Sequence, residues 1–213
     1  MGTLSNLNAD LDYCRTAAEA KSGPFDGDFA ARYEEHFPTL HGLFQQIYGE
    51  REGLLEALAE VIAVAHESWN ERPSDLKELD AARAADPTWF TSEKMLGGVC
   101  YVDRYAGSLA GVGNQIPYFT ELGLTYIHLM PLFKSPEGEN DGGDAVSSYR
   151  EVDPKLGTMA ELRALATKLR AAGISPVVDF IFNHTSSEHE WAQKCVAGEP
   201  GFEDFYLIFP DRE

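Results

Sequence analysis

The feature that most constrains this chain is an apolar run that ends in polar residues, PVVDFIFNH at residues 176–184. Val and Ile favour a strand, and an almost continuous apolar run is typical of a strand in a covered parallel sheet. In parallel α/β folds, chemistry lies at the carboxyl ends of the strands. The residues Asp179, Asn183 and His184 are therefore predicted to lie where a site would form.

The residues before this run alternate between short β-rich runs and helical patterns. The β-rich runs cover 98–102, 125–130 and 174–182, and helices are predicted over 114–122 and 158–172. Thr158 with Glu161 fits a capping box, and Gly173 ends that helix. A long Gly-rich loop is expected from Pro131 to about Ser148. Strands alternating with helices predict right-handed βαβ units in a parallel sheet that helices cover.

Residues 1–90 have a different pattern, with apolar residues at helical spacing. One stripe runs through 52–69, and an earlier one runs from Phe29 to Ile47. Asp26 or Asp28 is expected to cap the earlier helix, and Pro38 to break or kink it. A further helix is predicted from Pro73 and Ser74 to about Ala85. The sequence thus predicts a helical N-terminal domain at 1–90, followed by an α/β domain at 97–213.

Composition excludes several classes of partner. The formal net charge is −18, from 35 acidic and 17 basic residues, which argues against nucleic acid and anionic membranes. The N-terminus has no signal-peptide pattern, and no apolar run approaches the roughly 18 residues of a membrane span, so a cytoplasmic protein is expected. The composition leaves the oligomeric state open.

Neither a metal site nor a nucleotide cofactor is predicted. Cys14, Cys100 and Cys195 are widely spaced and form neither a disulfide framework nor a zinc pattern. The stretch HTSSEH at 184–189 has one residue too many for H-x-x-E-H and follows a strand, whereas that motif needs a helix. There is no G-x-G-x-x-G after the first strand and no Walker lysine motif.

The run DFIFNH at 179–184 resembles the D-x-x-x-N-H region of the α-amylase superfamily, glycoside hydrolase family 13. The segments 124–143, 145–158 and 180–195 are similar to amylosucrase and its close relative sucrose hydrolase. The helical N-terminal region also suits amylosucrases, so the resemblance covers essentially the whole chain. It implies a (β/α)8 TIM barrel, of which residues 97–213 are the first three β/α units.

The resemblance implies an enzyme of carbohydrate metabolism that cleaves sucrose with retention. The glucosyl group passes to a growing α-1,4-glucan or to water, and fructose is released, so sucrose and α-glucan are the expected partners. Such enzymes use two carboxyl groups about 5–5.5 Å apart, as nucleophile and as acid. In the family these follow the fourth and fifth strands, beyond Glu213, so this chain alone is expected to be inactive. Alternatives are a sucrose hydrolase, another hydrolase fragment of the family, or a non-catalytic remnant with weak sugar binding.

By family position, His184 is expected to hydrogen-bond a hydroxyl of the glucosyl ring, and Asp141 to contact the same unit. Asp179 is expected to have a structural role, pointing into the barrel and holding a partner on a later strand. Asn183 is expected to brace the loop; in relatives that bind calcium it would be a ligand, but amylosucrase-like members are not expected to need the metal.

Asp144 departs from the family pattern, which has an aromatic residue there as a stacking platform under the glucosyl ring. A carboxylate lacks the apolar face that stacking uses, so Asp144 is expected to damage sucrose turnover. A three-stranded open sheet would also leave unpaired edges and a bare face. The isolated chain is therefore expected to aggregate or to need further sequence.

Overall fold

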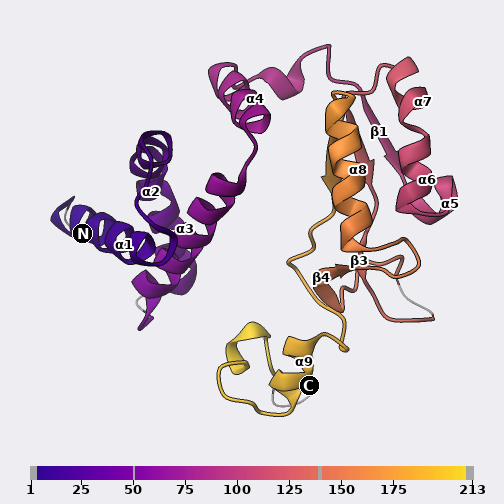
Figure 1. The fold of residues 1–213 in the computed structure, drawn as a ribbon. Coiled ribbons are helices and arrows are strands. Elements are labelled where there is room, and N and C mark those ends of the chain that lie inside the picture. Colours follow the sequence, from indigo (N-terminus) through magenta and orange to yellow (C-terminus); the bar gives the residue numbers. More distant parts are fainter. Residues whose placement is uncertain (1–3, 50, 139–140, 210–213) are drawn as a thin grey trace. The chain divides into compact units, whose positions relative to one another are not determined.

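A computed structural model describes residues 4–49, 51–138 and 141–209 of the chain (Figure 1). The chain divides into two compact units, Met1–Pro87 and Thr88–Glu213. Four helices form the first unit, and a parallel sheet with its covering helices forms most of the second. Among the described residues, no helix combines the length and the apolar character needed to cross a membrane.

The first unit contains helices α1 (Leu4–Ser22), α2 (Gly27–Tyr48), α3 (Leu54–Glu71) and α4 (Ser74–Ala85). The first three share a core of buried side chains, namely Cys14, Ala18, Tyr33, Phe37, Leu58, Ala59, Ile62 and Ala63. These residues recur at the helical spacing that the sequence shows, so the helices at these positions are confirmed. That residues 1–90 form a separate domain stays a prediction.

Helix α2 begins as predicted but does not break at Pro38. Asp26 is the N-cap, and its Oδ1 accepts the Phe29 N–H at 2.7 Å. The helix runs through Pro38 to Tyr48, with Phe37 and His41 buried on either side of the proline. A proline removes one helical hydrogen bond. Here the packing of the neighbouring turns outweighs that loss, so of the two expected effects the break is absent, and the kink stays a prediction.

The second unit contains a parallel sheet of β1 (Gly97–Cys100), β2 (Tyr126–Leu129) and β5 (Ser175–Val178), in the order β1-β2-β5. Helices α5 (Val102–Ala106), α6 (Leu109–Asn114) and α7 (Ile116–Glu121) connect β1 to β2, and α8 (Met159–Ala171) precedes β5. The same unit also contains η1 (Trp89–Thr91), α9 (Glu190–Val196) and η2 (Glu203–Phe205). The predicted parallel sheet is confirmed, and closure of a barrel stays a prediction.

The capping box at the start of α8 is confirmed. The Thr158 hydroxyl accepts the Glu161 N–H at 3.2 Å, and the Glu161 carboxylate accepts the Thr158 N–H at 2.8 Å. Two donors that the first turn leaves without a helical partner are thereby satisfied.

A short hairpin interrupts the segment that was expected to be a loop. Strands β3 (Phe133–Lys134) and β4 (Ser148–Val152) pair antiparallel, with Lys134 opposite Ser148. Their pairing brings the start of the Gly-rich segment back beside its end. The loop between them is therefore anchored at both ends, close to the carboxyl ends of the parallel strands.

Helices cover one face of the sheet. Ile127 and Leu129 of β2 join α5, α6, α7 and α8 in a single core. On the other face Val99 of β1 is 65% exposed and Val177 of β5 is 41% exposed. Successive side chains on a strand point to opposite faces, so these apolar strands are covered on one side only within the described residues. The bare face expected of an open three-stranded sheet is seen there.

Candidate functional site

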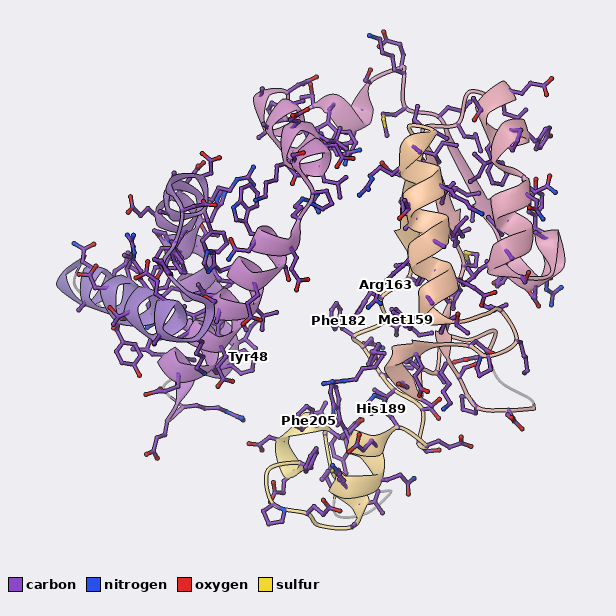
Figure 2. All side chains as sticks on the ribbon, viewed as in Figure 1. Tyr48, Met159, Arg163, Phe182, His189 and Phe205 are labelled. Carbon is purple, nitrogen blue, oxygen red and sulfur yellow. The ribbon has the colours of Figure 1, made fainter. Side chains whose placement is uncertain are left out.

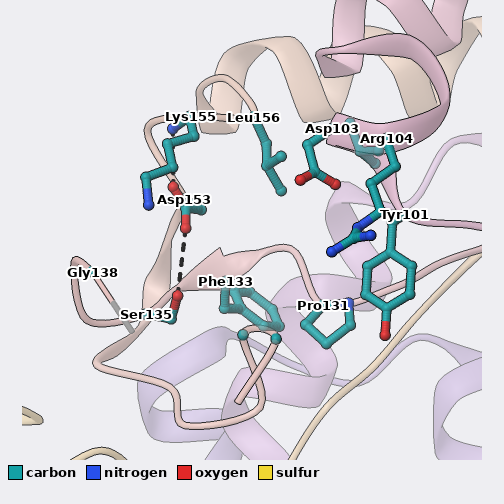
Figure 3. Close-up of a pocket in the computed structure, with 13 residues that line it drawn as sticks. Tyr101, Asp103, Arg104, Pro131, Phe133, Ser135, Gly138, Asp153, Lys155 and Leu156 are labelled. Carbon is teal, nitrogen blue, oxygen red and sulfur yellow. Dashed lines mark hydrogen bonds between the residues drawn. The ribbon is translucent and has the colours of Figure 1, made fainter. Parts of the chain in front are cut away.

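A polar hollow of about 350 Å³ lies beside the carboxyl ends of β1 and β2 (Figure 3). Its walls come from the segments that follow β1 and β2 and from residues 153–156 after β4. The side chains that give it its character are those of Tyr101, Asp103, Arg104, Pro131, Phe133 and Lys155. Aromatic faces beside acidic and basic groups suit a polar ligand with apolar ring faces, such as a sugar.

None of the predicted site residues lines this hollow, and only Asp141 and Asp144 adjoin lining residues in the sequence. Gly142 and Gly143 form part of its wall, and they lie between Asp141 and Asp144 in the sequence. Asp141 and Asp144 are both exposed. The Asp141 Oδ1 accepts the Ala145 N–H at 2.9 Å, which closes the Gly-rich loop on itself. Asp144, where the sequence analysis expects a departure from the family pattern, therefore lies on an exposed loop next to residues that line the hollow.

Asp179 follows β5 and contacts the neighbouring strand. Its Oδ1 lies 2.9 Å from Nε2 of His128, in the middle of β2. The partner that the structure shows is thus on an earlier strand, whereas the prediction placed it on a later one. This pair links β2 to the first residue after β5. The sequence signal for His128 is a polar residue between the buried Ile127 and Leu129, which places it on the opposite face of the strand.

Asn183 and His184 are neighbours whose side chains also contact each other. The Asn183 amide nitrogen lies 3.2 Å from Nδ1 of His184. If Asn183 donates, Nδ1 is the acceptor and the proton of the neutral imidazole resides on Nε2. Both side chains are exposed. The sugar-binding and bracing roles given to them stay predictions.

His189, at the end of the HTSSEH stretch, has a structural environment. It is buried, and its Nδ1 accepts the Trp191 N–H at 3.1 Å as the N-cap of α9. Burial lowers the pKa of His189, because desolvation disfavours the charged ring. This histidine therefore holds a helix end, a task that the sequence reading did not assign.

A match to a known family decides what kind of chain this is. A family profile described as the alpha amylase catalytic domain matches residues 68–213. The chain belongs to the α-amylase family. The predicted α-amylase resemblance is thus confirmed at the level of the family, and the parallel sheet belongs to an α-amylase catalytic domain fold.

The curated relatives of this α-amylase family chain include glycosidases. Maltase 1 of Drosophila virilis is 44% identical over 101 residues, which is 47% of this chain and 16% of the relative. Trehalose-6-phosphate hydrolase of Escherichia coli K12 is 35% identical, covering 47% of this chain and 18% of the relative. Oligo-1,6-glucosidase of Parageobacillus thermoglucosidasius is 32% identical, covering 50% and 19%. The chain thus spans less than a fifth of the length of these relatives.

Solved structures of α-amylase family proteins show the same similarity. A family GH13_31 enzyme matches with a TM-score of 0.51 and 32% identity over 56% of this chain and 23% of that one. Bacillus licheniformis trehalose-6-phosphate hydrolase matches with a TM-score of 0.51 and 28% identity over 57% and 23%. A mutant of trehalulose synthase MutB in complex with the substrate sucrose matches with a TM-score of 0.50 and 29% identity over 57% and 22%.

Proposed function

We propose that this chain contributes the glucosyl-binding part of an α-glucosidase-type glycoside hydrolase, in which residues 97–213 form the first β/α units of a (β/α)8 barrel. The observation that carries the proposal is the placement of the D-x-x-x-N-H segment at the carboxyl end of β5, in a chain that matches an α-amylase catalytic domain. The names of its relatives, maltase, trehalose-6-phosphate hydrolase and oligo-1,6-glucosidase, support hydrolysis of α-linked glucosides.

In this proposal His184 and Asp141 hold hydroxyls of the glucosyl unit. The contact with Asn183 keeps the His184 proton on Nε2, so that nitrogen donates to the sugar. The Asp179 carboxylate contacts the His128 ring, and the Asp141 carboxylate accepts the Ala145 N–H. We therefore do not assign them as the pair of carboxyl groups, about 5–5.5 Å apart, that a retaining glycosidase uses. We assign Asp179 a positioning role and Asp141 a binding role.

A sucrose-cleaving glucosyltransferase is the second candidate. The similarity of segments 124–143 and 145–158 to amylosucrase favours it, and a matched structure holds sucrose as its substrate. The two candidates share a glucosyl-binding site and differ in the acceptor, which is water or a glucan. Incubation of a full-length form with sucrose alone separates them, because polymerisation gives glucan with little free glucose.

We expect the chain to bind α-linked glucosides and His184→Ala to weaken that binding about 2- to 10-fold, the equivalent of one lost hydrogen bond. Saturation-transfer NMR with maltose, sucrose and trehalose measures the affinity, and cellobiose serves as the β-linked control. His36→Ala changes an exposed histidine of α2 and is expected to have no effect. Failure to bind any α-glucoside, or equal binding of cellobiose, contradicts the proposed function.

We expect Asp144→Tyr to strengthen binding of the same glucosides about 2- to 10-fold. A tyrosine ring adds a stacking face worth roughly 0.5–1.5 kcal/mol, which the carboxylate lacks. Asp144→Asn is the matched control, because it removes the charge without adding a ring. Titration of the three proteins with maltose distinguishes the effects. Equal affinities for the Tyr and Asn variants would show that charge, and not stacking, matters at this position.

A further inference from the structure

We propose that Tyr149 is a positioning residue that sets the conformation of the segment carrying Asn183 and His184. This inference rests on the proposed function, because it deepens the role of His184. Tyr149 lies on β4, apart in the sequence from the D-x-x-x-N-H segment, and neither the motif nor the family match gives it a role.

The hydroxyl of Tyr149 reaches two backbone carbonyls of the segment. It donates to the carbonyl of Ile181 and lies 3.4 Å from the carbonyl of His184. Phe182 and Asn183 fall between these two points, and Phe182 is 85% exposed (Figure 2). The stretch that carries the predicted sugar ligands therefore has little packing of its own. A single side-chain hydroxyl contacts both of its ends.

The ring of Tyr149 is itself held in place. It stacks on Phe180 with ring centroids 5.2 Å apart and an interplanar angle of 11°, and Phe133 meets it edge-on at 6.0 Å. The buried His189 lies at 5.5 Å from the same ring. Aromatic pairs of this kind stabilise the position of the ring beyond the burial of their area. Burial also raises the pKa of Tyr149, so the hydroxyl remains a donor at neutral pH.

The same stretch of chain also fixes the loop of Asp141. The Asp141 carboxylate accepts the Ala145 N–H, and the carbonyl of Val146 accepts the Ser186 N–H at 2.9 Å. Residues 145–149 therefore hold Asp141 at one end and the Asn183–His184 segment at the other. The Tyr149 hydroxyl completes this connection through its contacts with the carbonyls of Ile181 and His184. The relative position of the two predicted glucosyl contacts thus depends on the Tyr149 hydroxyl.

Removal of this hydroxyl should change site geometry more than fold stability. Tyr149→Phe keeps the ring and its stacking, and it removes only the donor. Tyr33 gives a matched control, because its hydroxyl donates to the Leu11 carbonyl at 2.7 Å in the helical unit. Tyr33→Phe therefore loses the same kind of bond far in sequence from the candidate site. Both variants should lower stability to a similar small extent.

The test combines maltose binding with NMR of the His184 ring in the full chain. We expect Tyr149→Phe to weaken maltose binding about 3- to 10-fold and to displace the His184 ring resonances. Tyr33→Phe should leave both unchanged. Phe180→Leu keeps the hydroxyl but loosens the ring, and we expect it to weaken binding in the same direction. Phe180→Leu also tests the positioning role if Tyr149→Phe does not fold.

The possible outcomes separate this inference from the proposed function. An unchanged His184 signal in Tyr149→Phe overturns the positioning role, whether or not the sugar binds. Normal maltose affinity in that variant overturns it as well. If the wild-type chain does not bind maltose but Tyr149→Phe still displaces the His184 signals, the proposed function fails and the positioning role stands.

Discussion

Gly111→Ala is expected to destabilise the sheet unit by about 3 kcal/mol, at the upper end of the cost of overpacking. Gly111 lies in α6, close to the end of α5. A Cβ atom there would lie 2.0 Å from the carbonyl oxygen of Ala106, which is backbone and cannot rotate away. The Gly111 N–H also donates to the Ser108 hydroxyl that caps α6. A shift of the helix to relieve the contact would therefore weaken its cap.

Gly113 in the same helix is the control for this prediction. A Cβ atom at Gly113 would meet the Leu165 side chain at 3.7 Å, an ordinary van der Waals contact. Alanine is a better helix former than glycine by about 1 kcal/mol, so Gly113→Ala should be neutral or slightly stabilising. Amide hydrogen exchange, read residue by residue in β1 and β2, measures the stability of this unit separately from the helical unit. Similar protection from hydrogen exchange in Gly111→Ala and Gly113→Ala would contradict the prediction. It would mean that the backbone between α5 and α6 shifts to admit the extra methyl group at little cost in free energy.

Leu129→Ala is expected to lower the free energy of unfolding of the same unit by about 2–5 kcal/mol. Leu129 is fully buried at the end of β2, in the core that the sheet shares with α6 and α8. Its removal leaves a cavity directly beneath the carboxyl ends of the strands. A typical domain is stable by only about 5–15 kcal/mol, so this change removes a large part of the total.

Leu122→Ala makes the same chemical change at an exposed position. Leu122 follows α7 and is 48% exposed. Surface substitutions usually change stability by less than about 0.5 kcal/mol. Urea unfolding followed by hydrogen exchange compares the two variants. A loss of less than 1 kcal/mol for Leu129→Ala would show that the core collapses around the missing side chain.

The elements that the sequence predicted well are those whose signal is local. Thr158 and Glu161, three residues apart, determine the start of α8. Apolar residues at helical spacing determine which side of α2 faces the core. The strand β2 lies in a short β-rich run that Pro131 ends, and it alternates the buried Ile127 and Leu129 with less buried residues. In each case the residues that determine the structure are close neighbours in the chain.

The elements that were missed depend on distant partners. The hairpin of β3 and β4 joins Lys134 to Ser148 across a Gly-rich loop, and the two residues of β3 are too few to show a period. The predicted run 174–182 is a strand only to Val178, because Asp179 turns to His128 and the following residues turn to Tyr149. The helix predicted at 114–122 corresponds to α7, with Pro117 in its first turn, and the preceding helices α5 and α6 were missed.

The residues of the candidate site also divide into those with a local sequence signal and those without one. The D-x-x-x-N-H pattern identified the segment with Asp179, Asn183 and His184 from neighbouring residues alone. His128 and Tyr149 were missed because each acts through a contact with residues more than thirty positions away. Such contacts leave no periodic or local pattern in one sequence. They follow only from the register of β2, β4 and β5.

The link between Val146 and Ser186 is a hydrogen bond between two backbone groups. A hydrogen bond from the Ser186 N–H to the Val146 carbonyl does not depend on which side chains surround it. We therefore expect a substitution at Asp144, such as the proposed Asp144→Tyr, to leave this backbone link in place. In the proposed function, a change of ligand preference at this position would then cost little foldability.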